Sequence, residues 1–456
     1  MSGPSIVDTE PVTGLQQLVD YCAGGCKPPN RWRIGTEYEK FIYRLGDLSP
    51  APYDGPRGIA ALLERLRIYG WEPAFEHGRI IGLSQGHCAI TLEPSGQLEL
   101  SGAPRRTLHH TCAETGTHLR QLRAVTEGLG LGFLGIGFEP RSPREAMPWM
   151  PKGRYALMRD YLPRKGGHGL DMMLRTCAIQ VNLDYASEAD MVRKYRVGLA
   201  LQPLVTALFA ASPFAEGRPS GYLSYRAQVW CDTDPDRCGI PAFVFEEGFG
   251  FERYVEHVLD VPMLFVYRDG RYLDPEGRTF RDFLRRRLPC LPAERPTMGD
   301  WADHLTTLFW DVRMKRFLEM RGADGGPQGQ VCALAALWVG LLYDADALEA
   351  AWALVGDWRH GEVEALHRAV PRLALRTRLR GLRLQDIALE MLAIAEHGLR
   401  RRNRIGPDGH DESQYLDPLW EIARSGCSRA EALLDAYGGE WGGSVEPLMR
   451  ASARLP

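Results

Sequence analysis

The sequence predicts an α+β fold built around an antiparallel sheet of about six strands. Five segments alternate polar and apolar residues with the period of two that a half-buried strand requires. They are Arg31 to Tyr43, Ala89 to Ser101, Thr176 to Tyr185, Pro262 to Leu273 and Lys315 to Arg321. Long helical patterns lie between these strands without the strict alternation of a doubly wound parallel sheet, which favours α+β over α/β.

The helical patterns repeat apolar residues on one face. They cover Pro56 to Tyr69, Leu108 to Leu129, Ser187 to Ala211, Cys332 to Tyr343, Leu384 to Arg402 and Arg429 to Tyr437. The third opens with Ser187 and Asp190 at capping-box spacing, and Pro203 should kink it. No repeat or linker interrupts the chain, so we predict one domain over residues 1–456, with the sheet mainly in 31–330 and a helical part over about 331–456.

The bulk composition is that of an ordinary globular protein, with 456 residues, 45% apolar and 25% charged. The 55 Lys and Arg against 58 Asp and Glu leave a net charge of -3, which gives no field to collect nucleic acid or an anionic membrane. Met1 to Pro11 has no signal-peptide or transit-peptide pattern, and no apolar run approaches the roughly 20 residues that span a bilayer. We therefore predict a cytoplasmic protein without nucleic-acid or membrane partners.

Acids and amides gather on one face of four predicted strands. Glu37 and Glu39 are two residues apart and therefore share a face. The full set is Glu37 and Glu39 in the first strand, Glu93, Gln97 and Glu99 in the second, Gln180, Asn182 and Asp184 in the third, and Glu319 with Arg321 in the fifth. This arrangement holds for the second strand only if Pro94-Ser95-Gly96 does not shift its register.

Two interpretations of this face compete. Polar faces of antiparallel sheets usually meet solvent, and for any one strand that is the simpler interpretation. Taken together, however, the carboxylates have few basic neighbours in register, so they would repel one another unless divalent cations neutralised them. Hard oxygen ligands without accompanying Cys or His favour Mg²⁺ or Mn²⁺ over zinc.

Basic residues that could contact phosphate surround the fifth strand. They are Arg313, Lys315, Arg316 and Arg321, and a glycine-rich loop follows them. The sequence has no P-loop and no Rossmann glycine motif. Upstream, Arg175, Arg226 and Arg237 could bind a carboxylate, and Tyr225 and Trp230 could wall a small substrate, although surface charge and core aromatics account equally well for these residues.

Five segments resemble the plant and proteobacterial glutamate-cysteine ligases. In chain order they read IGTEYEKF, TLEPSGQLELSGAP, MMLRTCAIQVNLDYASEADMVRKYRVGLALQP, FRDFLRRRLPC and RFLEMRGADGG, and the similarity extends from about Pro11 to the C-terminal GGEWGGSVEP. That family belongs with glutamine synthetase in the carboxylate-amine ligase superfamily. The resemblance therefore implies a curved antiparallel sheet with a metal and nucleotide site on its concave face, surrounded by helices, as the catalytic core of a single glutamate-cysteine ligase domain.

The resemblance also implies roles for individual residues. Metal ions and ATP phosphates would be held by Glu37, Glu39, Glu93, Glu99 and Glu319. Arg321 and Lys315 would face the transferring phosphoryl group, and Arg313 and Arg316 would join Lys315 in binding ATP. Arg226 and Trp230 would hold glutamate. The remaining substrate-binding residues would be Gln180, which stands where some distant relatives have a metal-binding His, and Arg175, Cys177 and Met173 near the cysteine pocket.

The implied reaction is ATP-dependent ligation of the γ-carboxylate of L-glutamate to the amine of L-cysteine through a γ-glutamyl phosphate. It yields γ-glutamylcysteine, ADP and phosphate, and is the first step of glutathione biosynthesis. We expect ATP and Mg²⁺ as cofactors, with Mn²⁺ as a substitute, in a monomer or homodimer. Two alternatives stay open: a ligase of the same mechanism for another acid or amine, and a non-catalytic homologue, which is disfavoured because all five Glu positions are filled.

Cysteine positions differ from those of the plant relatives. Cys290 matches one partner of a plant hairpin pair, but Pro275 stands at the other position, so that pair should be absent. Cys112 and Cys332 match a second plant pair. Whether they bond is open, and we expect two buried thiols because a cytosolic chain is kept reduced. The loop from Cys231 to Cys238 lacks zinc-ligand spacing and is interpreted as lying beside the substrate.

Overall fold

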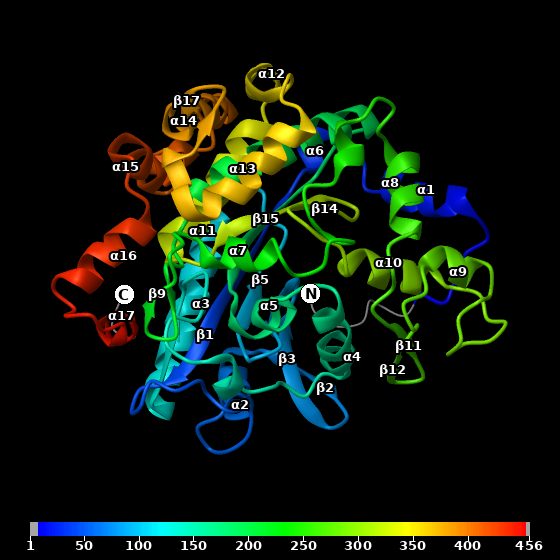
Figure 1. Cartoon of the computed structure of the whole chain (residues 1–456), viewed down its shortest axis with the longest axis horizontal. Coiled ribbons are helices and arrows are strands. Elements are labelled where there is room, and N and C mark those ends of the chain that lie inside the picture. Colours follow the sequence, from blue (N-terminus) through cyan, green and yellow to red (C-terminus); the bar gives the residue numbers. More distant parts are fainter. Residues whose placement is uncertain (1–7, 453–456) are drawn as a thin grey trace.

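A nine-stranded sheet forms the centre of the molecule, which the computed structural model describes from residue 8 to residue 452 (Figure 1). Along the sheet the strands are β14 (Val312–Met314), β15 (Leu318–Asp324), β7 (Ala178–Leu183), β1 (Ile34–Arg44), β5 (Leu98–Ser101), β4 (Cys88–Leu92), β3 (Arg79–Gln85) and β2 (Glu72–Glu76), with β6 (Leu131–Leu134) paired to β1. All neighbouring strands in this sheet are antiparallel. The predicted α+β class is therefore confirmed.

The sheet is larger than the six strands expected. The additional strands include the hairpin β2–β3, whose side chains alternate poorly in burial because it forms the edge of the sheet. The segment Ala89 to Ser101 is two strands rather than one, because the chain turns at Pro94-Ser95-Gly96, where Gly96 has a φ of +82°. The segment Pro262 to Leu273 turns at Asp269-Gly270 and forms a hairpin outside the main sheet.

Seventeen helices surround the sheet in the described part of the chain. They are α1 (Leu15–Ala23), α2 (Ile59–Leu66), α3 (Leu108–Leu129), α4 (Gly153–Tyr161), α5 (Gly169–Arg175), α6 (Glu188–Leu208), α7 (Tyr225–Trp230), α8 (Phe251–Leu259), α9 (Phe280–Leu284), α10 (Met298–Thr306), α11 (Gln328–Leu342), α12 (Ala345–Val355), α13 (His360–Leu373), α14 (Leu384–Arg402), α15 (Asp417–Ser425), α16 (Arg429–Gly438) and α17 (Glu446–Ser452). Short strand pairs connect them: β8 (Phe214–Ala215) with β9 (Arg218–Pro219), β10 (Cys238–Gly239) with β13 (Phe309–Trp310), β11 (Val266–Arg268) with β12 (Arg271–Leu273), and β16 (Arg378–Leu379) with β17 (Leu382–Arg383).

The apolar face of the sheet packs against long helices. Helix α6 contacts β15, and α11 contacts β7 and β1. The side chain of Ser187 accepts the N–H of Asp190 at the start of α6, so the predicted N-terminal cap is present. The C-terminal helices α14 to α17, coloured orange to red, lie on one side of the molecule, and α8 to α10 lie on the other (Figure 1). From residue 331 to residue 452 the chain is almost wholly helical, with only the short pair β16–β17 between the helices.

The sequence predicted neither a targeting segment at the N-terminus nor a segment that spans a bilayer. Residues 1–7, which are part of the N-terminal stretch searched for a targeting pattern, lie outside the described residues. Within the described residues, no single helix has the length and apolar character to cross a bilayer. Helices α11 and α12 reach that length and composition only as a pair bent by 91°, and most of α11 is buried in the core.

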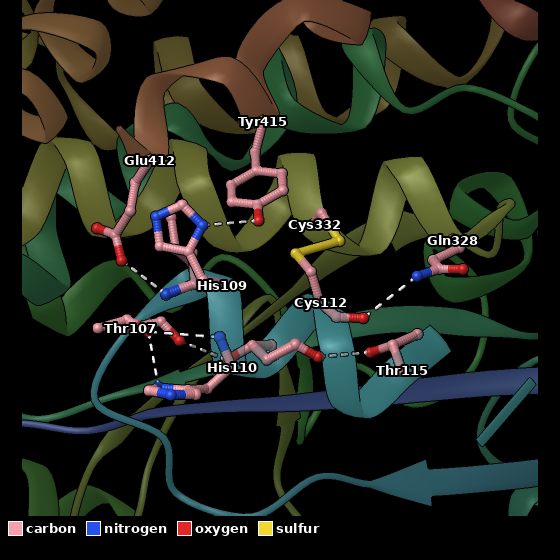
Figure 2. The surroundings of a disulfide bond; sticks show 11 residues. Thr107, His109, His110, Cys112, Thr115, Gln328, Cys332, Glu412 and Tyr415 are labelled. Atoms are coloured by element: carbon pink, nitrogen blue, oxygen red, sulfur yellow. Dashed lines mark hydrogen bonds between the residues drawn. A yellow bond between two sulfur atoms is a disulfide. The ribbon is translucent and has the colours of Figure 1, made fainter. Parts of the chain in front are cut away.

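A disulfide joins α3 to α11, which corrects the expectation of two buried thiols. Cys112 and Cys332 have Cα atoms 5.7 Å apart, within the range that a disulfide spans, because the two helices pack side by side (Figure 2). Nearby, the Glu412 carboxylate accepts the Leu108 N–H at 2.7 Å, and His109 Nδ1 lies 2.9 Å from the Tyr415 hydroxyl (Figure 2). The C-terminal region is thus tied to the start of α3.

We expect the C112A/C332A double variant to lose about 2–5 kcal/mol of unfolding free energy, because the disulfide closes a long loop in the unfolded chain. Urea denaturation of the oxidised wild type, the reduced wild type and the variant measures this loss. Cys427→Ala, at an exposed free thiol, is the matched control. Equal midpoints for the oxidised and reduced wild type would contradict the expected loss.

Candidate active site

Strand register brings the predicted acids and amides onto one face of the sheet. Directly opposed residues of antiparallel strands point to the same side. The opposed pairs are Glu39 with Glu99, Glu37 with Gln180, Glu319 with Asn182, and Glu319 with Arg313. Glu93 follows β4 in the turn to β5 and lines the same cavity as Glu39. The prediction that four segments contribute to one polar face is therefore confirmed.

The side of this face formed by β1, β5 and the β4–β5 turn carries negative charge that nearby cations offset only in part; we call it the acidic half. Burial raises the pKa of Glu39 well above its ordinary value, and the carboxylates of Glu93 and Glu99 raise it further. Burial likewise raises the pKa of Glu93 to about 7, with Glu99 adding to it against the pull of Lys152 and Arg154. Holding these acids close together costs free energy, and such an arrangement is typical of functional sites.

Hydrogen bonds fix the orientation of two of these carboxylates. Glu39 accepts the backbone N–H of Ala178 at 2.6 Å and the Gln180 amide at 3.3 Å. Glu37 accepts the Asn182 amide at 2.9 Å. For Glu37 as well, burial is the main cause of a raised pKa, followed by repulsion from Glu319 and Glu99. Strand β7 therefore positions the acids of β1 without supplying positive charge.

The other side of the face, formed by β14 and β15, contains a cation cluster around one carboxylate. Glu319 is 0% exposed and contacts Arg313 at 2.6 Å, Lys315 at 2.7 Å and Arg321 at 2.5 Å. Burial would raise the pKa of Glu319, but these three cations hold it well below its ordinary value. Glu319 therefore acts as their shared counterion in this structure. Arg316 lies apart from them and donates to the Gly24 carbonyl.

A cavity of about 100 Å³ lies between the two halves. Its wall includes seven predicted site residues, namely Glu39, Glu93, Met173, Gln180, Arg226, Trp230 and Arg321. Arg226 Nε, Arg321 Nε and Trp230 Nε1 are buried, and within residues 8–452 they have no hydrogen-bond partner. Because leaving a buried donor unpaired costs free energy, these three groups indicate a ligand that carries acceptor oxygens, such as a carboxylate or a phosphate.

Two predicted substrate residues do not line this cavity. Arg175 is buried in an ion pair with Asp171 at 2.7 Å and contacts Glu216 at 3.1 Å, so its guanidinium is already occupied by protein carboxylates. Cys177 is fully buried in a separate apolar cluster that includes Phe41 and Leu134. From the sequence, their places in a motif gave no information on which way their side chains point.

Sequence reasoning missed the part of the wall that α4 supplies. Arg154 and Tyr155 line the cavity, and Arg154 Nε is another buried donor without a partner in the described chain. Just before the helix, Lys152 donates to the Leu92 carbonyl at 2.7 Å. Basic residues are unfavourable at the start of a helix because they oppose its dipole. Lys152 and Arg154 stand at such a start, which indicates a role other than helix stability, but strand periodicity does not detect it.

The chain is similar over nearly its full length to curated plant enzymes. It is 53% identical over 447 residues to the chloroplastic glutamate-cysteine ligase of Brassica juncea, covering 98% of this chain and 85% of that protein. It is 54% identical over 445 residues to the chloroplastic glutamate-cysteine ligase of Arabidopsis thaliana, covering 97% and 83%. The crystal structure of a glutamate-cysteine ligase from Francisella tularensis in complex with AMP has a TM-score of 0.57, with 93% of this chain and 88% of that chain covered. At 14% identity, this last similarity shows the fold alone.

The plant relatives overturn the predicted cytoplasmic localisation, because they are chloroplastic enzymes. That prediction was wrong for a physical reason. A small net charge and the lack of a long apolar segment suit any aqueous compartment, including the interior of a plastid, so they do not distinguish one compartment from another. The expectation of reduced cysteines rested on the same assumption.

The model of glutamate-cysteine ligase family 2 matches residues 33–451. This range contains every strand of the main sheet, both halves of the polar face and the cavity between them. The match agrees with the more than 50% identity to the plant enzymes over almost the whole chain. The chain belongs to glutamate-cysteine ligase family 2.

Proposed function

We propose that the chain joins the γ-carboxylate of L-glutamate to the amine of L-cysteine at the expense of ATP. The observation that carries this proposal is the cavity between acids and cations, where buried arginine and tryptophan N–H groups have no hydrogen-bond partner in the described chain and could bind acceptor oxygens of a ligand. The plant relatives are named for this activity, and the AMP bound to the Francisella enzyme supports an adenine nucleotide as substrate. This reaction requires no side-chain nucleophile, because ATP itself activates the carboxylate.

The reaction takes two steps because a carboxylate is a poor electrophile. A γ-carboxylate oxygen of glutamate attacks the γ-phosphorus of ATP, the bond to ADP breaks, and γ-glutamyl phosphate forms. The cysteine nitrogen then attacks the acyl carbon, loses a proton and expels phosphate. We propose that Arg321 and Lys315, which here pair with Glu319, neutralise the transferring phosphoryl group, with Arg313 as a third cation.

Glutamate would lie in the cavity. Arg226 is 4% exposed; its Nη2 donates to the Arg321 carbonyl at 2.8 Å, which leaves Nε free among the described residues for a substrate carboxylate. Trp230 forms the wall beside it. Such a rigid arginine holds the substrate stem while the γ-carboxylate reaches the cations, so the protein contributes mainly position and charge.

The acidic half fits a divalent cation. In residues 8–452, no three His, Cys, Asp or Glu side chains already converge at metal-binding distance, but the raised pKa values of Glu37, Glu39 and Glu93 mean that nearby cations do not fully offset their burial and mutual repulsion, and a divalent cation would. We propose that Glu37, Glu39, Glu93 and Glu99 hold Mg²⁺, with Mn²⁺ as a substitute. When bound, the ion supplies charge neutralisation for the phosphates. Glu319 would join them once its cations contact phosphate.

We expect Mg²⁺ binding to release protons at about pH 6, because a metal needs ionised carboxylates. The pKa of Glu93 is raised to about 7, so the carboxyl is mostly protonated below that pH and Mg²⁺ affinity should rise as the pH approaches 7. Isothermal titration calorimetry in two buffers of different ionisation enthalpy measures the protons released. Glu93→Gln should reduce their number, whereas Glu349→Gln on the surface should not. Heats that do not depend on the buffer would contradict this.

The direct test of function is ADP release with Mg-ATP and L-glutamate, in the presence and absence of L-cysteine, followed by mass analysis of the product. Release that depends on cysteine and a γ-linked dipeptide would establish the proposal. If another amine were needed, the ligase mechanism would survive and the acceptor assignment would fall. If folded protein with Mg²⁺ gave no turnover, the proposal would fail.

Arg226→Lys is expected to raise the glutamate KM by about a hundredfold with little change in the ATP KM, because lysine keeps the charge and loses the planar donor pair. Arg175→Lys is the matched control, since Arg175 lies outside the cavity and pairs with Asp171. Its glutamate KM should stay near normal. Initial rates over both substrate concentrations separate these outcomes, and an effect of Arg226→Lys confined to ATP would reassign the residue.

A further inference from the structure

An exposed thiol outside the cavity contacts a largely buried histidine and, through it, an aspartate. Cys231 follows the last residue of α7 and is exposed. Its Sγ lies 3.7 Å from Nδ1 of His367 on α13, and Nε2 of His367 lies 3.2 Å from Oδ2 of Asp311, between β13 and β14. Three separate segments thus place a thiol, an imidazole and a carboxylate in series.

The backbone holds Asp311 in place. Its N–H donates to the Gly239 carbonyl at 3.1 Å, and its carbonyl accepts the Arg321 N–H at 3.0 Å and the Gln202 amide at 2.9 Å. The carboxylate therefore has little freedom to leave the imidazole. Only 12% of the Asp311 side chain and 13% of the His367 side chain are exposed, so solvent screens their attraction weakly.

The charge states of this series favour an imidazolium beside the thiol. Burial alone would lower the pKa of His367, but the charge and hydrogen bond of Asp311, followed by Cys231, raise it well above its ordinary value. Burial opposes ionisation of Asp311, yet His367, Arg226 and Arg321 lower its pKa overall. An imidazolium next to a thiol stabilises the thiolate, which is the nucleophilic form of cysteine.

The other exposed cysteine of the described chain has a different environment. Cys427 contacts the Ser428 carbonyl, and its pKa is raised by partial burial and then by Glu431 and Asp435. Both thiols are exposed, but only Cys231 has an imidazole beside it, whereas Glu431 and Asp435 lie near Cys427. Cys427 serves as an internal reference for the reactivity of Cys231.

We propose that Cys231 is a nucleophilic thiol that reacts with small hydroperoxides. The Cys231 thiolate attacks the terminal peroxide oxygen, an S–O bond forms and the O–O bond breaks. Sulfur loses two electrons to the peroxide, and the departing alkoxide, or hydroxide from hydrogen peroxide, takes the proton of the His367 imidazolium. The products are a sulfenic acid at Cys231, an alcohol or water, and a neutral His367.

The test exposes the full-length protein to hydrogen peroxide at about pH 6, traps sulfenic acids with dimedone and measures each cysteine by mass spectrometry. An ordinary thiol is almost wholly protonated at that pH. We expect Cys231 to react about tenfold faster than Cys427, because only Cys231 has an imidazolium beside it that stabilises the attacking sulfur and gives a proton to the departing oxygen. Equal rates at the two cysteines would overturn the proposal.

Two variants test whether His367 and Asp311 make Cys231 reactive. His367→Gln should bring the ratio of Cys231 to Cys427 rates to about one, and Asp311→Asn should lower it. Buried Cys22 and Cys177 report unfolding, because they should stay unmodified in folded protein. If the His367→Gln protein modifies Cys22, the decision rests on Asp311→Asn and on the wild-type ratio. An unchanged ratio in a folded variant would also overturn the proposal.

Discussion

Replacing Glu319 with glutamine is expected to lower both stability and turnover. Glu319 is fully buried and is the shared counterion of Arg313, Lys315 and Arg321, so the neutral amide leaves three cations close together with no carboxylate between them. Removing one member of a buried ion cluster costs about 3–5 kcal/mol. We also expect kcat to fall about a hundredfold or more, because the cations lose the position from which they would stabilise the phosphoryl group.

Urea denaturation and the rate of ADP release measure the two effects. Glu349→Gln is the matched control, because Glu349 pairs with Arg193 on the surface, where an ion pair contributes at most about 1 kcal/mol. The pH dependence of the stability that Glu319 contributes follows from its lowered pKa. Its stabilisation is present above the unfolded pKa and is lost as the pH falls through the folded value, so the difference between wild type and variant should shrink in acid. Unchanged stability at neutral pH would show that the cations do not need Glu319.

Replacing Glu39 with glutamine is expected to abolish turnover without loss of stability. Burial and the carboxylates of Glu93 and Glu99 raise the pKa of Glu39, so its ionised form destabilises the folded protein when no cation is bound. A neutral amide removes that repulsion. We expect equal or higher unfolding free energy without Mg²⁺, and a fall in kcat of about a hundredfold or more because one metal ligand is lost.

The difference in stability between Glu39→Gln and wild type should depend on pH. A carboxyl with a raised folded pKa stabilises the protein below its unfolded pKa, and this stability is lost as the pH rises through the folded value. The advantage of Glu39→Gln over wild type should therefore grow from acid to neutral pH and diminish when Mg²⁺ is added. Urea denaturation with and without Mg²⁺ measures it. A less stable variant at neutral pH, or normal turnover at low Mg²⁺, would remove Glu39 from the metal site.

Strand periodicity predicted the polar face because it depends on local alternation. In β1, Glu37 and Glu39 necessarily share a face once the strand forms, and the same holds for Gln180 and Asn182 in β7. Helices with a continuous apolar face, such as α3 and α14, begin and end at the predicted residues. The edge strand β2 was missed because it is largely exposed, and its partner β3 was missed because its buried residues do not alternate regularly with exposed ones.

The relations between strands could not be read from local pattern. The role of Glu319 as a counterion depends on the pairing of β14 with β15, which places Arg313 opposite it. The disulfide depends on the packing of α3 against α11, and Cys112 and Cys332 are 220 residues apart in sequence. Arg154 reaches the cavity from a helix, so no strand alternation marked it. Tertiary contacts of this kind require the register and packing that only the structure supplies.

The strand order of the sheet also has a consequence for biosynthesis. The acids of β1 and β5 come from the first part of the chain, whereas β14 and β15, with their cations, follow much later and reach the sheet only by pairing with β7. Closing so long a loop costs chain entropy before any contact is gained. Since chains emerge from the ribosome N-terminus first, the nascent protein carries its cluster of carboxylates from residue 99 until the balancing arginines and lysine follow at residues 313–321.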